Sequence, residues 1–189
     1  MILTSNLVLV PLSLFSIPEK PQVETFVGWL NDPEVVKYSE NRHYQHSFES
    51  QMDYWSDLEA EPVRYFFIKT KQGDKSAMIG CASANYDEFN LSSDISIMLG
   101  DKNYWGKGLG KEAFGAMLEN ERLHGMKRVT AGMMETNTAM IRTALACGMK
   151  REAVIPDSFK VGDTRVPLVH RWRGRCVAQA QQKDHHREE

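Results

Sequence analysis

A glycine-rich turn is the segment of this chain whose residue types most directly suggest chemistry. Residues 104–113 read Tyr-Trp-Gly-Lys-Gly-Leu-Gly-Lys-Glu-Ala and join a strand-like run to a helical run. Glycines at alternate positions allow positive φ and let backbone N–H groups approach a ligand oxygen. The helix that follows adds unpaired N–H groups and the positive end of its dipole, while Lys107 and Lys111 add mobile charge. The turn therefore predicts a phosphate site, with a tight turn around a packing glycine as the alternative.

The spacing of these glycines excludes two common phosphate loops. A dinucleotide-binding turn reads G-x-G-x-x-G, whereas residues 106–110 read G-x-G-x-G. A nucleoside-triphosphate loop requires Gly-Lys followed by Ser or Thr, but Gly106-Lys107 is followed by Gly108.

The turn resembles the acetyl-CoA pyrophosphate loop of the GCN5-related N-acetyltransferase (GNAT) family, which reads Gln/Arg-x-x-Gly-x-Gly/Ala. Gly108 and Gly110 match the two fixed positions, and Trp105 replaces Gln/Arg. The form Tyr-Trp-Gly-Lys-Gly is similar to the branch that contains ribosomal-protein N-terminal and many bacterial small-amine acetyltransferases.

A second segment resembles the same family. Residues 137–142, Asn-Thr-Ala-Met-Ile-Arg, followed by Gly148-Met149, are similar to the family's Asn-x-Ala-Ser-Ile-Arg and Gly-Phe. The resemblance follows residues 5–172 in order and is strongest between 94 and 149. It implies acetyl-CoA as cosubstrate, with a backbone N–H near Leu99 polarising the thioester carbonyl. The implied cofactor-binding residues are Met98, Leu99, Trp105, Gly106, Lys107, Gly108, Leu109, Gly110, Asn137 and Arg142, although Asn137 also suits an ordinary helix N-cap.

The resemblance also suggests proton-transfer groups, because an amine must be neutral to attack. Asp94 is the first candidate base, since it occupies a strand position where many relatives carry Glu. Glu135 is the second, and solvated surface carboxylates are the alternative for both. The family's usual acid, a tyrosine seven residues after the Asn, is replaced by Ala144. The thiolate then leaves without a protein acid, or another segment supplies the proton.

Residues 38–44 are expected to hold the acceptor, because loops carry specificity on a fixed scaffold. Their side chains mix aromatic, acidic and basic groups. Arg42 suits a carboxylate or phosphate, and Glu40 suits a cationic amine. The candidate acceptor-binding residues are Tyr38, Glu40, Arg42 and His43, with ordinary exposed charges as the alternative.

The elements that must position these groups follow from hydrophobic periodicity. Strands are expected at 7–12, 65–69, 77–84, 95–99, 128–134, 150–155 and 165–172, with residues 72–74 as the turn of a hairpin. Helices are expected at 24–30, from Asp32 as N-cap with Pro33 first, after Ser47, at 109–123 and at 137–146. This order predicts a single α+β domain over residues 1–172, a mixed, mostly antiparallel sheet flanked by helices. The polar residues 173–189 are expected to form a flexible tail, which includes His185 and His186.

Composition limits the partners and the compartment. Among 189 residues the net charge is −2, which offers no general attraction to nucleic acid or anionic membranes. Cys81, Cys147 and Cys176 form no C-x-x-C pair and no zinc pattern, so we expect a reduced, cytoplasmic setting and no metal. No membrane span or leader sequence is expected. The apolar strand residues Val166, Leu168 and Val169 suggest a homodimer formed through edge strands.

Three functions remain open from the sequence. The first is an acetyl-CoA-dependent N-acetyltransferase acting on a primary amine of a small metabolite, aminosugar or polypeptide N-terminus. The second is a non-catalytic acyl-CoA-binding or interaction module, suggested by Ala144. The third is a nucleotide-dependent enzyme that uses the same turn.

Overall fold

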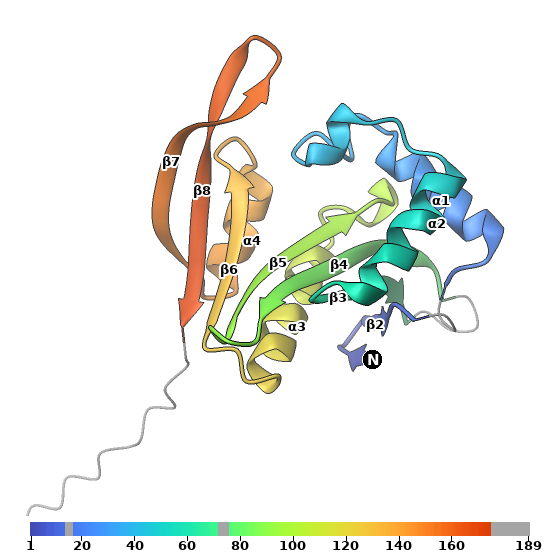
Figure 1. Cartoon of the computed structure of the whole chain (residues 1–189), viewed down its shortest axis with the longest axis horizontal. Coiled ribbons are helices and arrows are strands. Elements are labelled where there is room, and N and C mark those ends of the chain that lie inside the picture. Colours follow the sequence, from blue (N-terminus) through green and yellow to red (C-terminus); the bar gives the residue numbers. More distant parts are fainter. Residues whose placement is uncertain (14–16, 72–75, 175–189) are drawn as a thin grey trace, which may run out of the picture.

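A computed structural model describes residues 1–13, 17–71 and 76–174 of the chain. Within them, one sheet of eight strands has the order β1-β2-β3-β4-β5-β6-β8-β7, with helices on its faces (Figure 1). The strands are β1 (Ile2–Leu3), β2 (Leu7–Pro11), β3 (Val63–Thr70), β4 (Met78–Asp87), β5 (Ser92–Leu99), β6 (Arg128–Met134), β7 (Lys150–Val161) and β8 (Thr164–Gly174). The helices are α1 (Lys20–Leu30), α2 (Phe48–Asp57), α3 (Leu109–Leu123) and α4 (Thr138–Ala146), with short 3-10 turns at Glu40–His43, Leu58–Ala60 and Lys102–Tyr104. The predicted α+β, mostly antiparallel fold is confirmed.

Two hydrophobic cores hold the helices to opposite faces of the sheet. On one face α3 packs on the strands, with Phe114 and Met117 fully buried. On the other face α1 and α2 cover β3 with a second core around Trp55. Side chains on a strand alternate between faces, so β3 sends Phe66 to the first core and Phe67 to the second. This double burial explains why β3 reads as a continuous apolar run.

Strands β5 and β6 pair over only a few residues. They are the sheet's parallel pair, and their register ends at Asp94 opposite Thr130. Beyond this point they diverge, as Figure 1 shows. β5 stays paired with β4 up to Leu99 opposite Gly80. One edge of residues 95–99 is therefore free of a neighbouring strand.

Gly80 lets β4 and β5 approach closely at the end of this pairing. A Cβ on Gly80 would lie 2.0 Å from the carbonyl oxygen of Met98 and 3.0 Å from the Cα of Leu99. Both are backbone atoms, so the clash is not relieved by a rotamer change. The position of the free segment of β5 thus depends on a glycine in the neighbouring strand.

Gly80→Ala is expected to lower the free energy of unfolding by about 1–3 kcal/mol, because β5 must move to admit the methyl group. Urea denaturation at neutral pH measures the change. Gly28→Ala is the matched control: Gly28 is exposed in α1, and a Cβ at this position would meet no atom within 4 Å. It should stabilise the protein by about 0.5–1 kcal/mol through helix propensity. Equal stabilities of the two variants would contradict the close approach.

The structure differs from the sequence prediction at several elements. The helix predicted from Asp32 and Pro33 is wrong, because residues 31–39 form turns. In these turns Asp32 accepts a hydrogen bond from the N–H of Glu34 (2.9 Å) and forms an ion pair with Lys102 (2.7 Å). α1 begins at Lys20 rather than at residue 24. β8 continues to Gly174, so the predicted domain boundary at 172 falls inside a strand. The predicted turn at 72–74, Cys176 and the tail from residue 175 lie outside the described residues.

The predicted edge strand is also wrong. β8 lies between β6 and β7, so Leu168 and Val169 already have strand partners on both sides, while Val166 pairs with Phe159 of β7. Within the described part of the chain, the edges of the sheet are β1 and β7. A homodimer that pairs Leu168 and Val169 of β8 with a second copy is therefore excluded, and dimer formation itself stays a prediction.

Candidate functional site

A cavity of about 1250 Å³ lies where β5 and β6 separate. The part of its wall that is formed by β5, the turn and helix start at 104–111, β6 and α4 is called the donor side. We call acceptor side its wall from α1, residues 34–46, α2, Tyr65 of β3 and Cys81 of β4. The glycine turn and the predicted acceptor segment therefore face the same cavity from two directions.

The glycine turn presents several backbone N–H groups to the donor side of the cavity. Gly106 and Gly108 have φ of 72° and 80°, a region that favours glycine, and no atom lies within 4 Å of a Cβ built on either. Gly108 is the N-cap of α3 without a side-chain cap, and the N–H of Glu112 makes the bond to Gly108 that opens the helix. The preceding N–H groups of residues 109–111 have no acceptor within the helix. Such a helix start attracts an anion.

Acidic Glu112, in the first turn of α3, does not occupy this anion site. Its two carboxylate oxygens accept hydrogen bonds from the backbone N–H (2.7 Å) and the side-chain amide (2.9 Å) of Asn6. Burial by itself raises the pKa of Glu112, but the hydrogen bonds from Asn6 and Thr4 outweigh it and lower the pKa. The cation on this wall of the cavity is Lys111.

Trp105 fastens the turn to the free end of β5. Its indole N–H donates to the carbonyl oxygen of Leu99 (2.8 Å). Because Gly100 donates to the carbonyl of Ile79 (2.9 Å), the neighbouring pair of Gly80 and Leu99 is non-hydrogen-bonded, so the N–H of Leu99 points away from β4. That N–H is directed toward the opening between the strands. The tryptophan that departs from the family pattern thus has a structural role of its own.

Most predicted cofactor-binding residues lie on the cavity wall. Met98, Leu99, Trp105, Gly106, Gly108, Gly110 and Asn137 line it, whereas Lys107, Leu109 and Arg142 do not. Asn137 caps α4, since its side-chain oxygen accepts a hydrogen bond from the N–H of Met140 (3.1 Å). The two interpretations of Asn137, helix cap and cavity residue, therefore coexist. Lys107 lies over the ring of Tyr104 (5.5 Å to the centroid).

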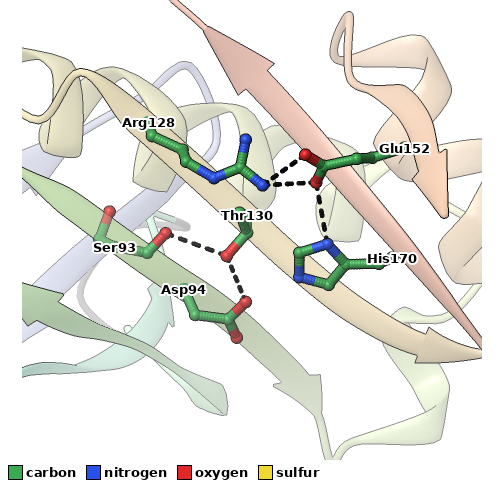
Figure 2. A network of polar contacts seen from close by, with 6 residues as sticks. All are labelled: Ser93, Asp94, Arg128, Thr130, Glu152 and His170. Atoms are coloured by element: carbon green, nitrogen blue, oxygen red, sulfur yellow. Dashed lines mark hydrogen bonds and ion pairs between the residues drawn. The ribbon is translucent and has the colours of Figure 1, made fainter.

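Asp94 lies at the apex of the strand separation, outside the cavity wall itself. Its carboxylate accepts a hydrogen bond from the hydroxyl of Thr130 (2.6 Å), whose oxygen also approaches the carbonyl of Ser93 (3.3 Å; Figure 2). Alternation along β5 puts Asp94 on the same face as Ser96 and Met98, which do line the cavity. Asp94 is thus fixed in orientation one step from the cavity.

The strands beside Asp94 are joined by a second set of contacts. Arg128 of β6 binds Glu152 of β7, and Glu152 contacts the imidazole Nδ1 of His170 in β8 (3.0 Å; Figure 2). Arg128 is the main reason why the pKa of Glu152 is lowered, with a smaller contribution from His170. These contacts hold the β7–β8 hairpin against β6, the strand that carries Thr130.

The second candidate base and the usual acid position do not face the cavity. Glu135 is exposed after β6 and is absent from the cavity wall. Ala144 is fully buried in the core between α4 and the sheet. Residues with hydroxyl groups that do line the cavity include Tyr54, Tyr65, Tyr104 and Thr143.

Of the four predicted acceptor residues, one lines the cavity, and the other three form ion pairs centred on Glu40. Tyr38 lines the cavity. Glu40 binds Arg42 (2.9 Å) and His43 (3.5 Å), and none of these three lies on the wall. Arg42 also donates to the carbonyl of Lys160 (3.2 Å), which links this loop to the end of β7.

Most residues of the acceptor side lie outside the segment predicted from the sequence. His46, Gln51, Tyr54 and Tyr65 line the cavity without having been predicted, whereas Tyr44, which also lines it, belongs to the predicted segment 38–44. One usable signal was the periodicity of α2, because Gln51 lies one helical turn before the buried Trp55 and hence on the same face. The others depend on tertiary packing.

Cys81 belongs to the same wall as a neutral thiol. Burial raises its pKa to about 11, and a hydrogen bond with Tyr65 lowers it only partly. The thiolate is the reactive form of cysteine, so Cys81 contributes packing and shape to the wall.

The family follows from a comparison with family models. The model described as "Acetyltransferase (GNAT) domain" matches residues 14–150, well over half of the chain. The chain belongs to the GNAT acetyltransferase family. The resemblance predicted from the two motifs is confirmed, together with the acyltransferase class and the donor, acetyl-CoA, that this family uses. No curated protein matches the chain in sequence.

Solved GNAT structures share the fold at low sequence identity. The spermidine N-acetyltransferase of Vibrio cholerae, in complex with CoA and spermine, is 15% identical with a TM-score of 0.77, over 90% of this chain and 96% of that one. RimL, a ribosomal L7/L12 α-N-protein acetyltransferase in complex with CoA, is 14% identical with a TM-score of 0.76, and the match covers 90% of this chain and 95% of RimL. The microcin C7 self-immunity acetyltransferase MccE, with acetyl-CoA and AMP, is 19% identical with a TM-score of 0.73, over 91% and 94%.

The donor side fits the diphosphate of the GNAT donor. The N–H groups at the start of α3 have no side-chain cap and can donate hydrogen bonds to an anion. The open space at Gly106 and Gly108 lets the anion approach them. Lys111 adds a cation on the same wall.

Among the described residues, no helix has the length and apolar character needed to cross a bilayer.

Gly108→Ala is expected to weaken CoA binding by about tenfold, because alanine resists positive φ by about 1–2 kcal/mol and would shift the turn. Isothermal titration calorimetry with CoA measures the affinity. Gly125→Ala is the control: Gly125 follows α3 at its other end, with φ of 83° and equally open space. Both variants should lose similar stability, and only Gly108→Ala should lose affinity. A loss of affinity in both would assign the effect to general destabilisation of α3.

Proposed function

We propose that the chain transfers the acetyl group of acetyl-CoA to a primary amine bound at the acceptor side of the cavity. The observation that carries this proposal is the continuity of the cavity, which reaches from the uncapped start of α3 to residues 34–46 and α2 through the gap between β5 and β6. Donor and acceptor can therefore meet beside the free edge of β5. The solved relatives act on spermidine and on a ribosomal protein N-terminus, which supports a primary amine as acceptor.

Acetyl-CoA supplies an acetyl group activated as a thioester. The N–H groups of residues 109–111 and of the glycine turn around Gly106 and Gly108 would bind the diphosphate of acetyl-CoA. The N–H of Leu99 is directed into the gap and would donate to the thioester carbonyl oxygen, where negative charge develops. Trp105 keeps the carbonyl of Leu99 engaged and so fixes the orientation of this peptide group.

The acceptor amine must lose a proton, and Asp94 is the proposed base. It lies two residues along β5 from Ser96 on the same face, a distance of about 6.7 Å for a strand. Because Asp94 lies next to the cavity and not on its wall, one water molecule would carry the proton from the amine to the carboxylate. Thr130 holds the carboxylate in place through its hydroxyl donor.

Acetyl transfer can be measured as CoA release with a thiol reagent. Polyamines, amino acids, aminosugars and short peptides are offered at saturating acetyl-CoA, and mass spectrometry identifies the acetylated product. Release that depends on one class of amine supports the proposal. CoA binding without release for any class would favour the alternative, a non-catalytic acyl-CoA-binding module, which the buried Ala144 at the family's tyrosine position also favours. Protection by nucleotides but not by CoA would instead indicate a nucleotide-dependent enzyme.

The cytoplasm is the proposed site of this reaction. Cys81 is a free thiol, and free thiols persist in a reducing compartment.

A further inference from the structure

The acceptor side of the cavity carries an unusual charge balance for a site that receives amines. The only carboxylate among its described lining residues is Glu34, which is already bound to Lys102 (2.8 Å). Lys102 also binds Asp32, and these two carboxylates raise its pKa. The wall also includes Lys37. A second ammonium group on the acceptor would therefore find no carboxylate on this described wall that is not already bound, and burial of an unpaired charge is strongly unfavourable.

Two buried polar side chains on the same side have atoms without a partner. Gln51 of α2 is only 3% exposed, and its amide Nε2 has no hydrogen-bond partner among the described residues. The Nε2 of His46 is likewise buried without a partner in the described part of the chain. Both residues line the cavity. Buried polar groups are nearly always hydrogen-bonded, so such atoms at a cavity wall point to a bound group that completes them.

The backbone around these two side chains is held in place. The side chain of Asn31 accepts from the N–H of His46 (2.9 Å) and donates to its carbonyl (2.8 Å). Ser47 and Ser50 form a reciprocal capping box at the start of α2, one residue before Gln51. Neither side chain is placed by a flexible loop alone. The site is thus preorganised for a ligand oxygen, because an amide N–H group donates.

The rest of the acceptor side is aromatic. Phe26, Tyr38, Tyr44, Tyr54 and Tyr65 line it. Burial is the main reason why the pKa values of Tyr54 and Tyr65 are raised, so their phenols stay neutral at physiological pH. Aromatic rings provide a large apolar contact surface with polar edges.

We infer that the acceptor is a primary amine that also bears a carbonyl or carboxylate oxygen and an aromatic or apolar body, in the manner of an amino acid or its amide, and not a polyamine. The oxygen accepts a hydrogen bond from the side-chain amide of Gln51 and contacts His46, while the apolar body packs on the tyrosines. This inference rests on the proposed acetyl transfer and names the class of acceptor for the same site.

The test compares matched amines on the wild-type protein. Phenylalaninamide, phenylalanine, phenethylamine and spermidine are assayed by CoA release at saturating acetyl-CoA. The expected kcat/KM for phenylalaninamide or phenylalanine exceeds that for phenethylamine, which lacks the oxygen, by about tenfold or more. Spermidine should stay at background. The ratio of the amide to the acid tells whether a neutral or an anionic oxygen is preferred.

Variants of Gln51 connect the preference to the side chain. Gln51→Met keeps a similar volume but removes the donor, so the advantage of phenylalaninamide over phenethylamine should fall to about one, with the KM for acetyl-CoA unchanged. Gln51→Glu introduces a carboxylate and should raise the activity toward spermidine. Circular dichroism and thermal melting confirm that each variant is folded, and the wild-type comparison of amines holds even if one is not.

The outcomes separate two failures. No CoA release with any amine would count against acetyl transfer itself. Release that is equal for phenethylamine and phenylalaninamide, or highest for spermidine, would overturn only the acceptor class. A preference for the oxygen-bearing amines that survives Gln51→Met would remove Gln51 from its proposed role.

Discussion

Replacing Asp94 by Asn is expected to lower kcat/KM for acetyl transfer by about 10²-fold or more at neutral pH, which is the usual contribution of a positioned general base. The substitution keeps the size of the side chain and an oxygen that can accept from Thr130. The fold around the strand apex should therefore persist. What is lost is the carboxylate that we propose takes the proton from the acceptor ammonium.

The pH dependence distinguishes this role from a structural one. An amine needs no base once the solution itself has deprotonated it, so the deficit of Asp94→Asn should shrink as the pH rises toward the pKa of the acceptor. A variant that merely distorts the cavity would show the same deficit at every pH. The measurement is a profile of kcat/KM against pH for both proteins. A rate within threefold of wild type and an unchanged profile would reject Asp94 as the base.

Glu135→Gln provides the comparison between the two candidate bases. Glu135 is exposed after β6 and does not line the cavity. Its replacement should leave the profile within about twofold of wild type, since surface substitutions rarely have larger effects. If Glu135→Gln gives the larger loss, the two assignments are reversed.

The elements around the donor are the part of the fold that local sequence rules describe well. α3 and β6 occupy 109–123 and 128–134 as expected, because strong periodicity and the glycines after residue 105 mark their limits. Both positive-φ glycines of the turn are also where the pattern places them. These features depend on residues close in sequence, so a motif carries them completely.

The acceptor side was predicted poorly because it depends on contacts between distant segments. Arg42 has the chemistry of a ligand-binding residue, but its guanidinium donates to the carbonyl of Lys160, which is 118 positions away in the sequence. Glu40 is neutralised by its own neighbours. By contrast, Gln51 has an ordinary residue type for a helix, and its place on the cavity wall appears only in the fold. Residue type alone does not reveal which polar groups are already satisfied by the fold.

Arg64→Met is expected to lower the free energy of unfolding by about 3–5 kcal/mol, because it leaves a buried carboxylate without its counter-ion. Glu121 of α3 is completely buried, and its carboxylate accepts from the guanidinium of Arg64 in β3 (2.7 Å) and from the amide of Asn120 (3.1 Å). Arg64 also stacks on Tyr86, 3.9 Å from the ring centroid. Urea denaturation at neutral pH measures the loss.

Two further variants decide whether the buried charge is the cause. In the double variant Arg64→Met with Glu121→Leu, both charges are gone, so most of the lost stability should return. Lys20→Met removes an exposed pair with Glu24 (3.9 Å) and should change stability by less than about 1 kcal/mol. If the double variant is as unstable as Arg64→Met, lost packing on Tyr86 is the main effect.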